Sequence, residues 1–316
     1  MKKRVAILFP GQGSQYEGMG KDIFDSSIEG SDTVLGLGSL VGEEAARKII
    51  EGGLDDLSKT RYAQPAIFLN SVLLYNQLKS MDIFDIEASL GLSLGEYSAL
   101  CCAGLFNLED GIRLVDIRGQ IMSEGAAGKG AMVAVMRSDI ETIQSIIDDA
   151  KGDGVLSICN LNSPSQIVVG GDFEAIESFE ARCSEKGIKR AVRLAVEGPF
   201  HTEILLEAAK KFEDYLKNIS FGKIQYDVYS NFNTNSYMDM NSDEEIVDTL
   251  KKQMYSPVLF ESCAKKLIMR GIDTFVEVGP GKGLSGFIKK IDKSCRVFNV
   301  QTLDDINNLR ENINIF

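Results

Sequence analysis

The apolar and polar positions of the chain alternate between short apolar runs and longer stretches with helical spacing. Short apolar runs bounded by turn residues predict strands, and apolar residues three or four positions apart predict helices. The elements predicted on either side of the middle are strands at Val5–Phe9 and Ile86–Leu90, helices at Gln64–Leu78, Gly95–Cys102 and Gly111–Met122, and late strands at Thr274–Val278 and Arg296–Val300. This alternation is typical of an α/β protein with a mainly parallel sheet.

The middle of the chain has a different order of elements. The pattern predicts β, α, β, β, α and β at Ala131–Met136, Ile140–Asp149, Val155–Cys159, Ile167–Gly170, Phe173–Lys186 and Ile188–Val196. This βαββαβ order is the ferredoxin-like arrangement, and glycines flank it on both sides. We therefore predict a large α/β domain formed by residues 1–127 and 198–316, an inserted subdomain at 128–197, and a ligand cleft between the two.

Composition and charge exclude several classes of function. The net charge of −12 leaves no basic excess to neutralise phosphates, so we expect no nucleic-acid partner. A single histidine and six cysteines without a C-x-x-C pair predict no metal site and a reducing compartment. The apolar run at Val5–Phe9 ends at Pro10, which is too short for a signal peptide, and no run of 18 apolar residues exists. We expect a cytoplasmic protein that does not engage a membrane.

A candidate nucleophile lies in the G-x-S-x-G motif at residues 91–95, which reads GLSLG. Glycines two positions either side of Ser93 permit a tight strand-to-helix turn that lifts the serine oxygen beside a helix N-terminus. A Gly/Ser turn without chemistry would show the same letters. The apolar strand before the motif and the helix after it favour the nucleophile.

The candidate base is His201, the one histidine of the chain. A lone histidine is more often structural, but a serine nucleophile requires a base and no other histidine is available. No Asp or Glu partner follows from the spacing, so a Ser–His dyad oriented by a backbone carbonyl would serve. Because the ordinary histidine pKa is about 6.5, we expect activity to depend on a deprotonation near neutral pH.

Eight blocks of sequence, in order, resemble the malonyl-CoA:acyl-carrier-protein transacylase family and the related acyltransferase domains of polyketide synthases. They are FPGQGSQ at 9–15, YAQPA at 62–66, SLGEYSA at 93–99, RGQIM at 118–122, NLNSP with QIVVGG at 160–171, GPFH at 198–201, QMYSPV at 253–258 and EVGPG at 277–281. Together they span nearly the whole chain, and their order is far more specific than any one block.

The resemblance implies a hydrolase-like α/β core with a ferredoxin-like insert. It also implies malonyl transfer from malonyl-CoA to the phosphopantetheine thiol of acyl carrier protein, for fatty-acid synthesis and without a cofactor. By position, the resemblance implies that Ser93 is the nucleophile and His201 the base, oriented by the backbone carbonyl of Gln253. It implies that the backbone N–H groups of Gln12 and Leu94 form the oxyanion hole and that Arg118 binds the malonyl carboxylate. It places Asn162 and Phe200 in the pocket, where Phe200 would disfavour methylmalonyl.

One departure from the family pattern leaves alternatives open. Members usually carry histidine just before the nucleophile, where this chain has Leu92. The alternatives are a trans-acting polyketide malonyltransferase, an acyl hydrolase using the same dyad, and a non-catalytic carrier-binding protein. Retention of Arg118 speaks against the hydrolase. Without the resemblance, Arg118 would be interpreted as a surface helix charge paired with Asp116 or Glu124.

A second glycine-rich motif lies near the end of the chain. Residues 281–286 read GKGLSG and imitate a dinucleotide fingerprint. Only about 30 residues follow, too few for the remaining strands of that fold. For an acidic carrier protein, we expect docking on a local basic patch despite the net charge, and the candidates are Lys189 and Arg190 on the insert together with Lys210 and Lys211 after the His201 loop.

Overall fold

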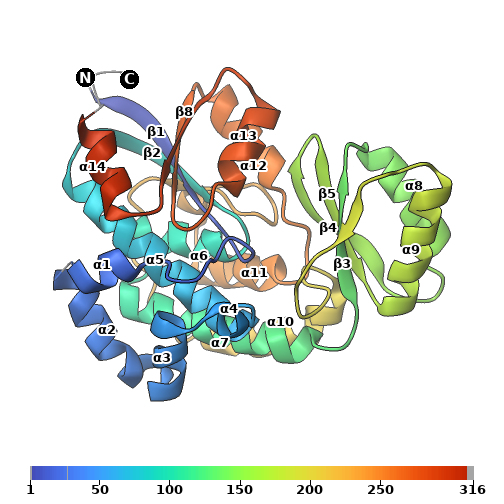
Figure 1. Ribbon diagram of the computed structural model, residues 1–316, viewed down its shortest axis with the longest axis horizontal. Helices are drawn as coiled ribbons and strands as arrows, with labels where there is room; N and C mark the ends of the chain where they lie inside the picture. Colours follow the sequence, from blue (N-terminus) through green and yellow to red (C-terminus); the bar gives the residue numbers. More distant parts are fainter. Residues whose placement is uncertain (1, 27, 312–316) are drawn as a thin grey trace.

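Two β-sheets organise the computed structural model, which describes residues 2–26 and 28–311 (Figure 1). A five-stranded parallel sheet has the order β7-β2-β1-β8-β9, and a four-stranded antiparallel sheet has the order β4-β5-β3-β6. The strands are β1 (Lys3–Phe9), β2 (Phe84–Gly91), β3 (Ala131–Met136), β4 (Leu156–Ser163), β5 (Gln166–Gly171), β6 (Ala191–Arg193), β7 (Asp227–Val228), β8 (Thr274–Val278) and β9 (Arg296–Val300). The predicted α/β fold class with a mainly parallel sheet is confirmed.

The central strand β1 is buried on both faces of the parallel sheet. Val5, Ile7 and Phe9 belong to the main core, whereas Ala6 and Leu8 belong to a second core on the opposite face. This two-residue alternation explains why the strand is a continuous apolar run, as in other parallel sheets covered by helices on both sides.

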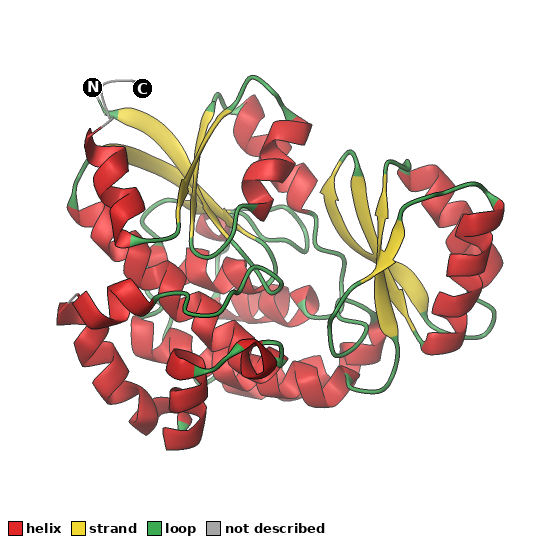
Figure 2. Cartoon of the chain, in the orientation of Figure 1, coloured by secondary structure: helices red, strands yellow, loops and turns green. Residues whose placement is uncertain are grey.

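Helices cover both faces of the parallel sheet, as Figure 2 shows in red. Apolar residues of α12 and α13 complete the second core, and those of α5, α6 and α7 contribute to the main core. The helices are α1 (Lys21–Ser26), α2 (Ile28–Val41), α3 (Glu43–Glu51), α4 (Leu54–Leu57), α5 (Thr60–Ser80), α6 (Leu94–Cys102), α7 (Leu108–Ala126), α8 (Ile140–Ala150), α9 (Phe173–Glu185), α10 (Leu206–Leu216), α11 (Asp243–Gln253), α12 (Phe260–Met269), α13 (Gly283–Ile291) and α14 (Leu303–Glu311).

The antiparallel sheet and helices α8 and α9 form the ferredoxin-like unit that the sequence predicts. The chain order β3-α8-β4-β5-α9-β6 is βαββαβ, and the unit has its own core built around residues such as Val133, Ile146 and Phe179. In Figure 1 this unit lies beside the parallel sheet, with α8 and α9 on its far side. The domain boundaries at 127/128 and 197/198 stay predictions.

The last strand of this unit is much shorter than predicted. The expected strand Ile188–Val196 is wrong in extent, because only Ala191–Arg193 pairs with β3 in a regular ladder. β6 is an edge strand with one neighbour, so its ends have no second ladder to hold them. Leu194 and Val196 leave the sheet and line the cavity described below.

Candidate active site

Three adjacent parallel strands deliver polar residues to the same edge of the sheet. Gln12 follows β1, Ser93 follows β2 and Asn231 follows β7. Because parallel strands share one carboxyl edge, the loops after neighbouring strands meet there, which is where α/β proteins bind ligands. Asn231 was not predicted, since its strand has only two residues and gives almost no sequence signal.

The turn that carries Ser93 is strained and tightly packed. Ser93 has φ 52° and ψ −98°, a left-handed backbone that L-residues rarely adopt. A Cβ on Gly91 would lie 1.9 Å from the carbonyl carbon of Gly95, and a Cβ on Gly95 would lie 2.0 Å from the carbonyl oxygen of Phe9. The Asn231 side chain braces the turn by accepting from the Ser93 N–H at 2.7 Å and donating to the Gly91 carbonyl at 2.8 Å.

His201 lies against the serine in the orientation that a base requires. Its Nε2 is 2.8 Å from the Ser93 Oγ, and its Nδ1 is 2.8 Å from the backbone carbonyl oxygen of Gln253. A carbonyl can only accept, so Nδ1 carries the hydrogen and Nε2 is free to accept the Ser93 proton. No carboxylate is needed for this orientation, in agreement with the dyad predicted from the sequence.

The expected titration of His201 near neutral pH is wrong for the resting site. Burial, and after it the nearby charge of Arg118, lowers its pKa from 6.5 to about 4, while hydrogen bonds to the backbone of Gln253 and Ser256 oppose the shift. The imidazole is therefore neutral at physiological pH. No local pattern in the sequence shows this burial.

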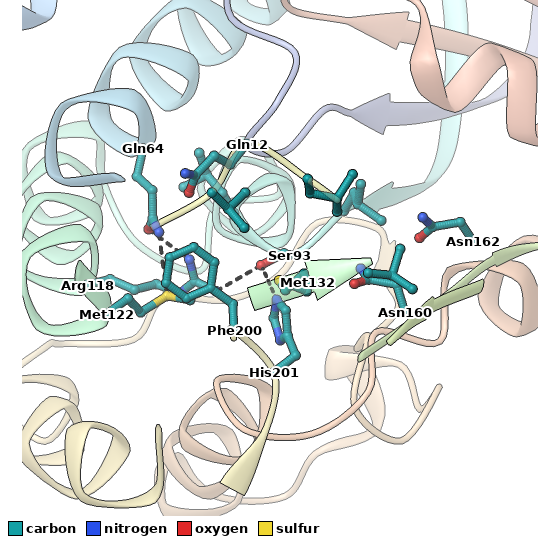
Figure 3. Close-up of a pocket in the computed structure, with 15 residues that line it drawn as sticks. Gln12, Gln64, Ser93, Arg118, Met122, Met132, Asn160, Asn162, Phe200 and His201 are labelled. Carbon is teal, nitrogen blue, oxygen red and sulfur yellow. Dashed lines mark hydrogen bonds between the residues drawn. The ribbon is translucent and has the colours of Figure 1, made fainter. Parts of the chain in front are cut away.

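Arg118 is fully buried and points at Ser93, as Figure 3 shows. Its guanidinium donates to the Gln64 Oε1 at 2.7 Å, to the Gln253 Oε1 at 2.9 Å and to the Ser93 Oγ at 3.1 Å. The guanidinium carbon also lies 4.9 Å from the centre of the Tyr97 ring. The interpretation of Arg118 as a surface charge paired with Asp116 or Glu124 is therefore wrong, and a buried cation lies beside the serine.

The remaining predicted residues surround the same cavity of about 130 Å³. Gln12, Leu94, Asn162 and Phe200 line it together with Ser93, Arg118 and His201. In Figure 3, Arg118 and Phe200 lie on one side of Ser93 and Asn162 lies on the other. Gln253 does not line the cavity as these residues do, but it forms hydrogen bonds with Arg118 and His201.

The ferredoxin-like unit contributes the wall of the cavity on the Asn162 side. Its strand β4 is held to the segment between α11 and α12 by Leu161 N–H donating to the Val258 carbonyl at 2.9 Å and Val258 N–H donating to the Cys159 carbonyl at 2.8 Å. These bonds place Asn162, and the unpredicted Asn160, against the cavity.

Leu92 also lines the cavity, and its side chain packs on the second core. Its backbone shapes the turn, because its N–H donates to the Phe9 carbonyl at 3.1 Å and its carbonyl accepts from the Gly95 N–H at 3.0 Å. Neither bond depends on the side chain, so the nucleophile turn forms without the family histidine.

The glycine motif at 281–286 opens α13, but a carboxylate of the chain itself occupies that helix N-terminus. Glu277 accepts from the backbone N–H groups of Leu284 at 3.1 Å and Ser285 at 2.8 Å, and from the side chains of Ser285 and Asn299. These are the N–H groups that would otherwise bind a phosphate. The motif is a structural helix start.

Within 2–26 and 28–311, no group of three or more histidine, cysteine, aspartate or glutamate side chains is arranged to hold a metal ion. In the same residues, no helix combines the length and apolar character needed to cross a membrane.

Comparisons with known proteins identify the family. Residues 7–303 match the acyl transferase domain family. The malonyl CoA-acyl carrier protein transacylase of Bacillus subtilis is 35% identical over 305 residues, covering 96% of this chain and 95% of that protein. The crystal structure of the transacylase of the same name from Clostridium perfringens is 38% identical, with a TM-score of 0.91 and coverage of 99% and 98%. A malonyl-transacylase solved in complex with its type II polyketide synthase acyl-carrier protein is 32% identical, with a TM-score of 0.91 and coverage of 98% and 99%. Ser93, His201 and the buried Arg118 line one cavity, and the family match extends over most of the chain, so this chain belongs to the acyl transferase domain family.

Proposed function

We propose that this acyltransferase moves a malonyl group from malonyl-CoA to the phosphopantetheine thiol of acyl carrier protein through an ester on Ser93. The observation that carries the proposal is the fully buried Arg118 guanidinium, 3.1 Å from the nucleophile oxygen. A buried cation beside an acyl-transfer serine selects an acyl group with its own negative charge. The names of the relatives support the same substrate and acceptor.

In the first half-reaction, the Ser93 Oγ attacks the thioester carbonyl while His201 Nε2 takes the hydroxyl proton. The carbonyl oxygen becomes an oxyanion, which the backbone N–H groups of Gln12 and Leu94 stabilise. The C–S bond then breaks, and the coenzyme A sulfur leaves with the proton from His201. The product is the malonyl-Ser93 ester.

In the second half-reaction, the phosphopantetheine thiol of the carrier protein gives its proton to His201 and attacks the ester. The tetrahedral intermediate uses the same two N–H groups, and Ser93 leaves with the proton returned by His201. Neither half-reaction changes an oxidation state, so the proposed cycle requires no cofactor. Neutral His201 starts both half-reactions, which fits its lowered pKa.

Selectivity in this proposal comes from three side chains of the cavity. Arg118 binds the malonyl carboxylate through its planar fork, which a neutral acetyl group leaves unpaired. Phe200, buried beside His201, crowds the α-carbon and disfavours methylmalonyl. Asn162, which is only 5% exposed, would contact the acyl or pantetheine group.

We place the reaction in cytoplasmic fatty-acid synthesis, with a trans-acting polyketide malonyltransferase as the alternative acceptor pathway. Among the described residues, none of the six cysteines forms a disulfide bond, which fits a reducing compartment. The large domain at 1–127 and 198–316 supplies the dyad, and the insert at 128–197 closes the cavity over it.

Ser93→Ala tests this function. We expect the wild-type protein mixed with malonyl-CoA to gain one malonyl group by intact-protein mass spectrometry, and the variant to gain none while its circular dichroism spectrum is unchanged. The wild-type adduct should persist until acyl carrier protein is added. Rapid loss of the adduct without carrier protein would instead show a hydrolase, and no wild-type adduct would show a non-catalytic binder.

A further inference from the structure

Behind the catalytic groups lies a buried carboxylate that the proposed mechanism does not use. Glu96 is one turn after Ser93 on α6 and has no exposed surface. Its Oε2 accepts from the Asn231 backbone N–H at 2.9 Å and from the Gln253 Nε2 at 3.1 Å, and its Oε1 accepts from the Tyr237 hydroxyl at 2.5 Å.

The Gln253 side chain bridges Glu96 to the catalytic groups. Its Nε2 donates to Glu96 and to the Ser93 carbonyl at 2.8 Å, so its Oε1 is turned toward Arg118 and accepts from it at 2.9 Å. The backbone carbonyl of the same residue holds His201 Nδ1. Holding the Gln253 amide in this orientation therefore fixes the arginine that faces the substrate.

Asn231 connects Glu96 to the nucleophile. Its backbone N–H is held by Glu96, while its side chain accepts from the Ser93 N–H and donates to the Gly91 carbonyl. The strained turn is thus braced by a residue that Glu96 anchors. A shift of Asn231 would release the turn from the conformation that presents the serine oxygen.

We propose that Glu96 is a positioning residue for acyl transfer, which holds Gln253 and Asn231 so that Arg118 and Ser93 keep their places. This inference rests on the proposed malonyl transfer. In the structure Glu96 accepts from three donors without offering a hydrogen, which a carboxylate does through its two oxygens, although burial raises the pKa of Glu96. A glutamine amide presents two hydrogens, so at least one of the three partners must turn or lose its bond.

The test is Glu96→Gln, with Glu277→Gln as the matched control. Glu277 is also fully buried and also accepts only from backbone and side-chain donors, but its partners, Leu284, Ser285 and Asn299, do not contact the dyad or Arg118. Both variants lose one buried carboxylate of the same size. The rate of Ser93 acylation is measured by rapid quench and intact mass, with malonyl-CoA and separately with acetyl-CoA, on protein shown to be folded by circular dichroism.

We expect Glu96→Gln to lower acylation by malonyl-CoA about tenfold and to reduce the malonyl-to-acetyl rate ratio at least about threefold, because the Gln253 amide that holds Arg118 on one side is no longer fixed. Glu277→Gln should leave both the rate and the ratio of the folded protein unchanged. An unchanged rate and ratio in Glu96→Gln, or an equal loss in Glu277→Gln, overturns the inference.

Tyr237→Phe replaces the test if Glu96→Gln fails to fold. It removes one donor from Glu96 and changes little else, so we expect a loss of about threefold in malonyl acylation, and full activity would overturn the inference. Acylation of the wild-type protein tests the proposed function separately from the role of Glu96. If the wild-type protein forms no malonyl ester, the proposed function fails. If it does and the variants match it, only the role of Glu96 fails.

Discussion

The pH dependence of Ser93 acylation is a direct test of the buried dyad. Burial and Arg118 lower the pKa of His201 from 6.5 to about 4, so the base is already neutral over the usual assay range. The ratio kcat/KM for the first half-reaction reports the free enzyme. We expect it to stay level from about pH 8 to about pH 5 and to fall with an inflection near 4, as His201 becomes protonated.

Arg118→Ala should move this inflection upward, because it removes the positive charge that opposes protonation of His201. Acetyl-CoA is the substrate for both proteins, since it does not need the arginine. The rate is measured by brief incubation at each pH and constant ionic strength, followed by acid quench and intact mass. A wild-type inflection near 6.5, or an inflection that Arg118→Ala leaves in place, would refute the role assigned to the two residues.

The lowered pKa of His201 also predicts that this residue stabilises the folded protein at neutral pH and that the stabilisation is lost in acid. Between pH 6.5 and about 4 the unfolded chain binds a proton that folded His201 excludes, so this contribution is complete above 6.5 and is lost as the pH falls through the folded value. Between about pH 8 and about pH 5 the loss amounts to about 2 kcal/mol in the free energy of unfolding. The difference in the free energy of unfolding between the wild type and His201→Asn, measured in urea, should therefore change by this amount between the two pH values. A difference that does not vary with pH would contradict the burial of a neutral imidazole.

The remaining predictions concern selectivity, the turn and carrier docking. Arg118→Ala should lower malonyl transfer far more than acetyl transfer, by roughly 10²-fold in their ratio in steady-state assays, because only malonyl carries the carboxylate; equal losses would mean that Arg118 is structural. Leu92→His should change the transfer rate little, since the turn bonds use the backbone of this residue; a dramatic gain would show an impaired enzyme and revive the binder alternative. Charge reversal of Lys189–Arg190, both exposed, should slow transfer to carrier protein but not to free pantetheine, and less so at high salt. Reversal of Lys210–Lys211 should have the smaller effect, because Lys210 is paired with Glu207 at 2.6 Å; equal losses with both acceptors would place either effect on the fold or the active site.

Much of the fold could be predicted from local pattern. β3, β8 and β9 have the predicted bounds, because continuous apolar runs between turn residues are a short-range signal. Ser93 was found for the same reason: its two glycines, the strand before it and the helix after it lie within about 20 residues. The roles of Gln12, Arg118 and Gln253 depended on resemblance, since nothing in their own segments distinguishes them from ordinary polar residues.

Tertiary structure alone decided how these groups act on one another. Ser93 is 138 residues from Asn231, and Arg118 is 135 residues from Gln253, so neither hydrogen bond has a sequence pattern. The lowered pKa of His201 arises from burial and from a cation on helix α7, and Glu277 occupies a helix start whose glycines suggested a phosphate. Short-range order follows from the spacing of apolar residues along the chain. Burial, charge and hydrogen-bond partners depend on segments that meet only when the chain folds, because desolvation and electrostatic interactions act through space.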